Sequence, residues 1–251
     1  MTLSTCGLIL KETKHKESDR ALTLLTDNGL VRAYAKAAQN IKSKKFAATS
    51  LFCYSEFVLY DSHDLYLVDE ASVREVFFEL RSDIEKLSLA QYFSELLIAV
   101  TPETADTADI LSLALNTFYL LCHSDKPNIL IKSVFELRLM TLIGFMPNLV
   151  GCEHCGTFQS DRPMYFDINA AVLLCADCNE AGAKPGVMTV SPAVLNAMRH
   201  IVYSKSKIIF SFKAAPQVLT QLSALTEKYV EVHLDRSFKT LNFYNSVRTT
   251  L

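Results

Sequence analysis

The chain has 251 residues, half of them apolar and 21% charged, which predicts a packed core in one or two domains and excludes wholesale disorder. The formal net charge of -2 is the sum of two parts with opposite charge. Residues 1–60 carry nine Lys/Arg and five Asp/Glu, and the remaining residues carry sixteen Lys/Arg and twenty-two Asp/Glu. We therefore expect an anionic ligand to bind the N-terminal part.

The chain shows no targeting or membrane-spanning pattern. No stretch reaches the roughly 18 apolar residues that a membrane helix needs, and the first residues lack the basic segment and cleavage site of a secretory signal. We therefore expect a cytoplasmic protein. In that reducing compartment its seven cysteines are expected to be free thiols or metal ligands rather than disulfides.

The first 75 or so residues read as β structure, with short strand-like runs separated by polar breaks. The turn Asp27-Asn28-Gly29 predicts that the second and third runs pair as a hairpin, because Asn-Gly supplies two positive-φ positions. Five short strands of this kind fit an OB-fold barrel and equally an SH3-like barrel. The runs are Leu8–Leu10, Ala21–Leu25, Leu30–Lys36, Phe52–Tyr60 and Leu65–Val73.

From about residue 76 onward the apolar residues recur at helical spacing. Residues 129–143 are apolar nearly all round, which predicts a central helix covered on several sides and ended by Gly144. Ser191-Pro192 predicts the start of a further helix. We predict an α+β chain with a barrel domain at 1–78 and an all-helical domain at 79–251. The other helical patterns lie at 89–100, 110–121 and 218–232.

Two Cys-x-x-Cys pairs interrupt the helical part, within an inserted segment at residues 150–183. Nineteen residues separate the pairs, within the usual spacing of about 15–20 for a Cys₄ zinc site. Four thiolates would complete a tetrahedron and leave no position for a reacting water, so the zinc is expected to be structural. The expected ligands are Cys152, Cys155, Cys175 and Cys178.

Other roles for the cysteines fit less well. Neither pair has the strand-helix setting of a dithiol redox centre, and the chain lacks the His-x-Glu of a zinc deaminase. His154 could replace one thiolate but is expected to be a solvated bystander. Cys6, Cys53 and Cys122 lie in apolar runs and are expected to be ordinary buried thiols.

A basic stretch at residues 30–46, LVRAYAKAAQNIKSKKF, contains no acidic residue. Strand alternation puts Arg32, Tyr34 and Lys36 on one face and small residues on the other. An aromatic ring between two cations suits a stacked base with neutralised phosphates, although a lysine run is often only a solvated face. The candidate DNA-binding residues are Arg32, Tyr34, Lys36, Lys42, Lys44 and Lys45.

The familiar enzyme motifs are missing from the sequence. It has no phosphate loop, no Gly-x-Gly-x-x-Gly, no Gly-x-Ser-x-Gly and no His-Glu-x-x-His. These absences favour a binding protein over an enzyme. Two binding classes stay open: a DNA-binding protein, and a zinc-stabilised adaptor that acts mainly through protein contacts.

Several segments together resemble the RecO family of bacterial DNA repair and recombination mediators. They are ESDRALTLLTDNGLVRAYAKAA, the IKSKK after it, ELRLMTLIGFMPNLVGCEHCG, LCADC and the closing RSFKTLNFY. The resemblance spans almost the whole chain. It implies an N-terminal OB-fold, a helical C-terminal domain with a Cys₄ zinc segment, and DNA contacts by Arg32, Lys36 and the lysines at 42, 44 and 45.

The resemblance also implies partners and a role without catalysis. Members bind single- and double-stranded DNA, anneal complementary strands and work with RecR. They help load RecA onto DNA coated by single-strand-binding protein (SSB), whose acidic C-terminal tail they bind. The sequence departs from the family pattern at two places: Ala37 and Ala170-Ala171 stand where many members have glycine.

Overall fold

The structure, a computed structural model, describes residues 2–62, 65–158, 162–179 and 185–248. Its contacts divide the chain into two compact units: one comprises Met1–Ser124 with Phe238–Thr250, and the other Asp125–Ser237. The first unit is therefore built from both ends of the chain. The predicted boundary after residue 78 separates a barrel from helices rather than two compact units, and it stays a prediction.

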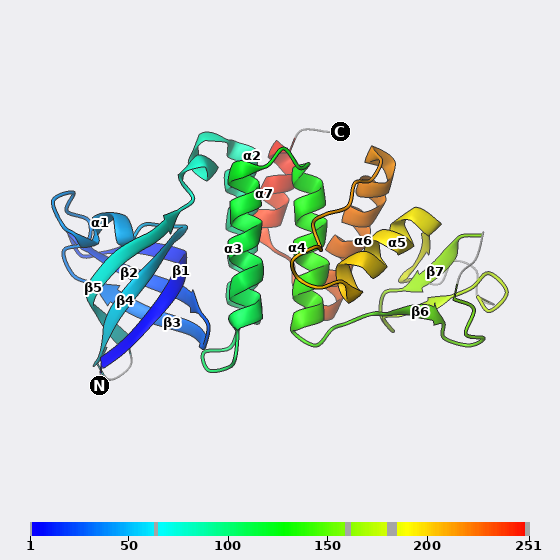
Figure 1. Cartoon of the computed structure of the whole chain (residues 1–251), viewed down its shortest axis with the longest axis horizontal. Coiled ribbons are helices and arrows are strands. Elements are labelled where there is room, and N and C mark those ends of the chain that lie inside the picture. The colour runs from blue at the N-terminus through cyan, green and yellow to red at the C-terminus, as the bar shows by residue number, and fades with distance from the viewer. Residues whose placement is uncertain (1, 63–64, 159–161, 180–184, 249–251) are drawn as a thin grey trace. The chain divides into compact units, whose positions relative to one another are not determined.

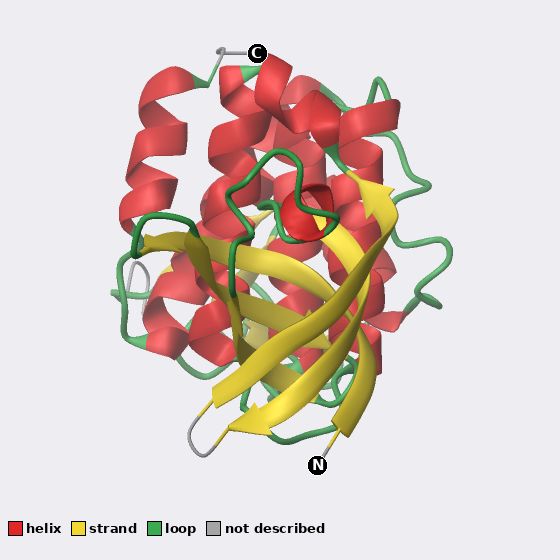
Figure 2. Cartoon of the chain, turned by 90° about the vertical axis from the view of Figure 1, so that its left-hand side faces the viewer, coloured by secondary structure: helices red, strands yellow, loops and turns green. Residues whose placement is uncertain are grey.

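A closed five-stranded barrel forms the start of the first unit (Figure 1). The strand order is β1-β2-β3-β5-β4, with β3 and β5 parallel and the other pairs antiparallel. This closed order is that of an OB-fold and decides against the SH3-like alternative. Figure 2 shows the strands crossing one another, as the tilt of strands in a small barrel requires. The strands are β1 (Thr2–His15), β2 (Asp19–Thr26), β3 (Gly29–Ala35), β4 (Cys53–Ser62) and β5 (Leu65–Val76).

Alternate residues of each strand fill the barrel interior. Leu24, Ala35 and Phe57 are completely buried, and Ala33 is nearly so. Small residues on β3 leave room for the larger side chains of the facing strands. Because full burial of a Leu or Phe side chain contributes about 1.5–3 kcal/mol, this apolar set fixes the register of the barrel.

The predicted hairpin joins β2 and β3, but its turn differs from the expected one. Thr26 pairs with Gly29, so Asp27 and Asn28 are the two central residues. Gly29 has a φ of 113°, whereas Asn28 does not have a positive φ. The prediction of positive φ at both Asn28 and Gly29 was therefore wrong, because the glycine follows the turn rather than occupying its second central position.

The connection between two helices of the first unit is bonded to this hairpin. The Leu30 amide donates to the carbonyl of Pro102 at 2.9 Å, and the Gly29 amide donates to Thr107 Oγ1 at 2.8 Å. A Cβ at position 29 would lie 2.6 Å from the Glu103 carbonyl oxygen. Glycine is therefore required here both for its backbone conformation and for this close approach.

Helices complete the first unit. α7 packs against α2, and Thr240 Oγ1 donates to Glu95 Oε2 at 2.5 Å. Asp83 caps α2 by accepting from the amides of Glu85 and Lys86. The elements are α1 (Lys45–Ala48), the 3-10 helix η1 (Phe78–Ser82), α2 (Ile84–Val100), α3 (Ala108–His123) and α7 (Lys239–Val247).

The second unit combines helices with a small sheet that the sequence analysis did not predict. Its helices are α4 (Asn128–Leu142), α5 (Pro192–Tyr203) and α6 (Pro216–Leu234). None of the helices in the described residues is long and apolar enough to span a membrane. The sheet has the order β6-β8-β7-β9, from β6 (Asn148–Cys152), β7 (Met164–Asp167), β8 (Val172–Leu174) and β9 (Val187–Val190).

The central helix α4 is covered as predicted, yet it buries two charged side chains. Lys132 and Glu136 have no exposed side-chain surface, and Lys132 Nζ lies 3.0 Å from Glu136 and 3.2 Å from Glu227 of α6. Thr226 Oγ1 donates to Glu136 at 2.7 Å. The charges are thus compensated by partners rather than by water.

Candidate nucleic-acid interface and metal centre

The basic strand β3 has the two faces that alternation predicts. Ala33 and Ala35 point into the barrel, Arg32 is exposed, and Tyr34 is half-buried. Lys36 follows the strand and is also exposed. The outer face of β3 therefore presents a ring with a cation on either side along the chain.

The segment after β3 is a run of turns rather than an extended loop. The Asn40 amide bonds to the Ala37 carbonyl, and the Ser43 amide bonds to the Asn40 carbonyl at 2.8 Å. Helix α1 follows directly. Lys42 and Lys44 are exposed on this segment, so both ammonium groups are available to a ligand in solvent.

Lys45 differs from the other predicted DNA-binding lysines. It is half-buried, and its Nζ donates to the Val68 carbonyl of β5 at 2.7 Å. Its charge therefore holds the start of α1 against the barrel, and it is less available to a ligand than Lys42 or Lys44.

Arg20 is a supporting residue that the sequence analysis missed. It is nearly buried, donates to the Phe46 carbonyl at 2.8 Å and to Thr49 Oγ1 at 2.9 Å, and pairs with Glu12 at 2.9 Å. Its guanidinium also lies over the Phe46 ring, 4.8 Å from the centroid. Arg20 thus fixes α1, and with it the end of the basic segment. Its position two residues before the buried Leu22 was the available signal, because strand alternation turns both residues inward.

Tyr34 is held in place by its neighbours. Its hydroxyl donates to Asp19 Oδ2 at 2.5 Å, and the His15 ring meets it edge-on with 5.1 Å between centroids. The bond to Asp19 raises the pKa of Tyr34 to about 12. The bonds from Tyr34 and from the Ala37 amide lower the pKa of Asp19. The ring is therefore pre-oriented, although its hydroxyl is already engaged.

The N-terminal half of β3, away from the basic segment, borders a surface hollow of about 470 Å³. Arg32 lines it together with two acidic residues, Asp61 and Glu103, and with Tyr66. Arg32 Nη2 lies 3.2 Å from Glu103 Oε1, and both side chains are well exposed. The local charge is thus less positive here than at Lys36, Lys42 and Lys44, which lie beyond the other end of the strand.

Arg138 and Arg199 of the second unit are committed to its own backbone. Arg138 donates to the carbonyls of Ile201 and Val202. Arg199 donates to the carbonyls of Leu149 and Phe158, each at 2.7 Å. They therefore tie α4 and the cysteine segment to α5, and their donors are largely used.

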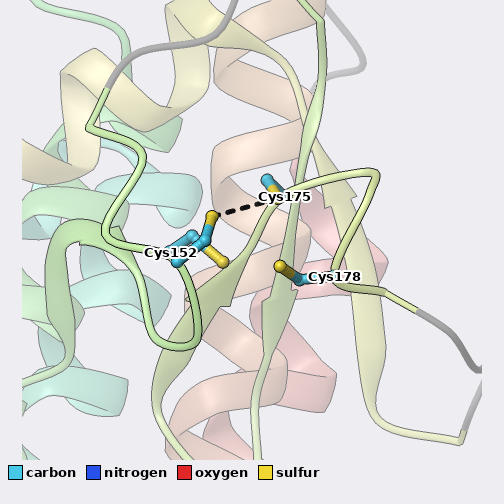
Figure 3. A group of neighbouring side chains, drawn as sticks. Cys152, Cys175 and Cys178 are labelled. Carbon is cyan, nitrogen blue, oxygen red and sulfur yellow. Dashed lines mark hydrogen bonds between the residues drawn. The ribbon is translucent and has the colours of Figure 1, made fainter.

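The structure brings the four predicted metal ligands together. The sulfur atoms of Cys152, Cys155, Cys175 and Cys178 all lie within 4.8 Å of one another. Cys152 ends β6 and Cys175 directly follows β8, so two neighbouring strands present the pairs. Figure 3 shows Cys152, Cys175 and Cys178 converging from two facing loops.

Tight turns shape each pair. The Gly156 amide donates to the Cys152 carbonyl at 2.8 Å, and the Cys178 amide donates to the Cys175 carbonyl at 3.2 Å. A Cβ on Gly151 would approach the Gly156 carbonyl oxygen to 2.9 Å, so this turn requires a glycine there. Both turns direct their sulfur atoms to a common centre.

Hydrogen bonds favour the thiolate form of two of the four cysteines, Cys155 and Cys152, whereas the neighbouring sulfurs of Cys175 and Cys155 raise the pKa of Cys178. Hydrogen bonds from the Thr157 side chain and amide lower the pKa of Cys155 to about 6. Burial opposes ionisation of Cys152, but bonds from the Cys155 and Cys175 amides outweigh it and lower its pKa. Four sulfur donors at this spacing can hold one metal ion and fill all four tetrahedral positions, which leaves no open position for catalysis.

Two family models match the chain and together cover most of it. Recombination protein O N terminal matches residues 1–77, and Recombination protein O C terminal matches residues 81–242.

Full-length relatives show the same likeness. The chain is 34% identical to the DNA repair protein RecO of Acetivibrio thermocellus, over 98% of this chain and 97% of that protein. It is 31% identical to the DNA repair protein RecO of Alkaliphilus metalliredigens, over 94% and 95% of the two chains. The chain therefore belongs to the RecO family of DNA repair and recombination proteins.

Proposed function

We propose that this protein is a non-enzymatic, cytoplasmic recombination mediator that binds single- and double-stranded DNA and anneals complementary strands. With RecR it would help load RecA onto DNA coated by SSB, whose C-terminal tail it would bind. The observation that carries the DNA part is that Lys36, Lys42 and Lys44 are exposed on the segment that directly follows β3, the strand that carries Tyr34, on an OB-fold barrel.

In this mechanism the three lysines neutralise phosphates while the pre-oriented ring of Tyr34 lies beside the bases. Each phosphate that is neutralised releases counterions and reduces the repulsion between two strands, so complementary strands can pair without nucleotide hydrolysis. Arg32 would extend the contact along β3. Lys45 and Arg20 would act indirectly, because they hold α1 under the segment.

The metal in this proposal is zinc, bound by Cys152, Cys155, Cys175 and Cys178. Four thiolates are a common structural zinc set, and the closed tetrahedron would contribute folding free energy rather than reactivity. Chelation should therefore lower the melting temperature of the protein, and replacing Cys175 by Ser should have the same effect. Metal analysis should give one tightly held zinc at this site.

The test of the DNA proposal is charge reversal. Lys42→Glu combined with Lys44→Glu should weaken single-stranded DNA binding for any sequence. It should also make the slope of log affinity against log salt shallower by about 1.4, at about 0.7 per lost contact. Lys205→Glu combined with Lys207→Glu changes the same charge at exposed positions of the second unit and should leave binding nearly unchanged.

Strand annealing with and without SSB separates the two binding classes. A mediator acting through DNA should lose annealing in the Lys42/Lys44 variant and retain it in the Lys205/Lys207 variant. If the first variant anneals normally while zinc removal abolishes docking to partner proteins, the adaptor function replaces the DNA-centred one.

A further inference from the structure

A second group of metal-ligating side chains lies in the first unit, well separated in sequence from the four cysteines. It consists of Glu79 in η1 and of Cys122 and His123 in the last turn of α3. A carboxylate oxygen, the Cys122 sulfur and a ring nitrogen of His123 all lie within 4.8 Å of one another. Elements that contact each other therefore bring together three different donor types.

The three side chains are already oriented by their neighbours. The Cys122 sulfur lies beside the Glu79 carboxylate where α3 contacts η1. The His123 ring packs on Tyr119, one turn earlier in α3, with 4.6 Å between centroids. Cys122 is half-buried, while Glu79 and His123 are exposed, so the group has a fixed base and an open side toward solvent.

We propose that Glu79, Cys122 and His123 form a second site for a divalent transition-metal ion, with zinc as the best-suited occupant. Sulfur and imidazole donors favour zinc or cobalt over magnesium and calcium, which prefer all-oxygen sites. Binding would displace the thiol proton to solvent, leaving sulfur, nitrogen and oxygen on the metal. Water would complete the tetrahedron in the remaining position.

The site of Glu79, Cys122 and His123 should exchange its metal ion at a different rate from the four-cysteine cluster. Four thiolates close the first site, whereas the second would keep a solvent-facing position and should exchange its metal faster. Lys86 is close enough to affect the Cys122 thiol electrostatically. Its positive charge opposes a bound cation, so neutralising it should strengthen metal binding.

The number of zinc ions bound tests the site directly. Full-length protein equilibrated with zinc by dialysis should bind two equivalents, and the second should be removed by a weak chelator. His123→Ala and Cys122→Ser should each bind one equivalent, and Lys86→Gln should bind the second more tightly than wild type. His123 is exposed at the end of α3. Without added zinc, the His123→Ala protein should therefore melt at the same temperature as the wild type.

Two controls make the outcome decisive. Cys6→Ser removes another half-buried thiol and should leave two equivalents. Cys175→Ser should lose the tightly held equivalent and keep the labile one. The proposal is overturned if wild type binds only one zinc, or if the second zinc persists in both the His123→Ala and Cys122→Ser variants. Neither result depends on DNA binding.

Discussion

Glu103 pairs with Arg32 across the hollow beside β3, with 3.2 Å between Oε1 and Nη2. The carboxylate therefore occupies a position where a phosphate could meet the exposed guanidinium. Its segment is bonded to the β2-β3 hairpin through Pro102 and Thr107, so the backbone that carries the acid is tied down. In the proposed function, Glu103 would compete with DNA phosphates for Arg32 at this end of the strand.

Replacing Glu103 by Gln should strengthen single-stranded DNA binding by about two- to fivefold, since exposed ion pairs contribute about 0–1 kcal/mol. The gain should shrink at high salt, because screening weakens the pair. Fluorescence anisotropy at two salt concentrations measures both effects. Glu231→Gln removes the acid of another exposed pair, with Lys228, and is the matched control. Equal gains in the two variants would contradict a local role for Glu103.

The Asp19–Tyr34 bond should be visible in titrations at both ends of the pH scale. A raised phenol pKa means that Tyr34 contributes stability below about pH 10, lost as the pH rises through about 12. A lowered carboxyl pKa means that Asp19 contributes stability above about pH 3.8, lost as the pH falls through its folded value.

Asp19→Asn should return the Tyr34 phenol toward its ordinary pKa of 10.0, measured by NMR of labelled tyrosine with Tyr34→Phe for assignment. The same variant should reduce the acid-side loss of stability. A Tyr34 pKa still near 12 in Asp19→Asn would assign the shift to burial instead.

Replacing Ala37 or Ala171 by glycine should stabilise the protein. Their φ angles are 55° and 57°, in the left-handed region that costs an L-residue roughly 1–2 kcal/mol. Glycine removes this strain but adds unfolded-state entropy, so each substitution should raise the free energy of unfolding by about 0.5–1 kcal/mol.

Urea denaturation of the two variants checks this expectation. Ala170→Gly is the matched control, because Ala170 is an exposed neighbour without a positive φ. It should be neutral or destabilising. If Ala37→Gly lowers the free energy of unfolding, the strain relieved at position 37 is smaller than the entropy that glycine adds to the unfolded state.

Lys132→Met should destabilise the protein by about 3–5 kcal/mol, because Glu136 would be left as a buried charge without its ammonium partner. Combining Lys132→Met with Glu136→Leu removes both charges and should recover much of that loss. Urea denaturation of the single and double variants measures the coupling. A double variant less stable than the sum of its single changes would contradict this account.

Periodicity predicted much of the fold, because most barrel strands and the helices α2 to α4 are long enough to show their apolar pattern. The small sheet escaped detection since β6 to β9 have only three to five residues each. Helix α7, of nine residues, was also missed. In both cases tertiary packing rather than local pattern defines the element.

The candidate sites divide in the same way. The spacing of two Cys-x-x-Cys pairs was enough to predict which four sulfur atoms lie together. The lysines of the basic stretch look equivalent in sequence, yet Lys45 reaches a carbonyl on β5, which only the folded chain reveals. Glu79 and Cys122 are brought together by the contact of two elements, and Cys122 was expected to be an ordinary thiol.

The docking of α7 on α2 has a consequence for biosynthesis. Within the described residues the second unit is one continuous stretch, Asp125–Ser237, whereas the first needs Phe238 and residues after it. During translation the middle of the chain can therefore fold before the unit that begins at the N-terminus is complete. The unit that contains the barrel would lack the packing of α7 on α2 until Lys239–Val247 has left the ribosome.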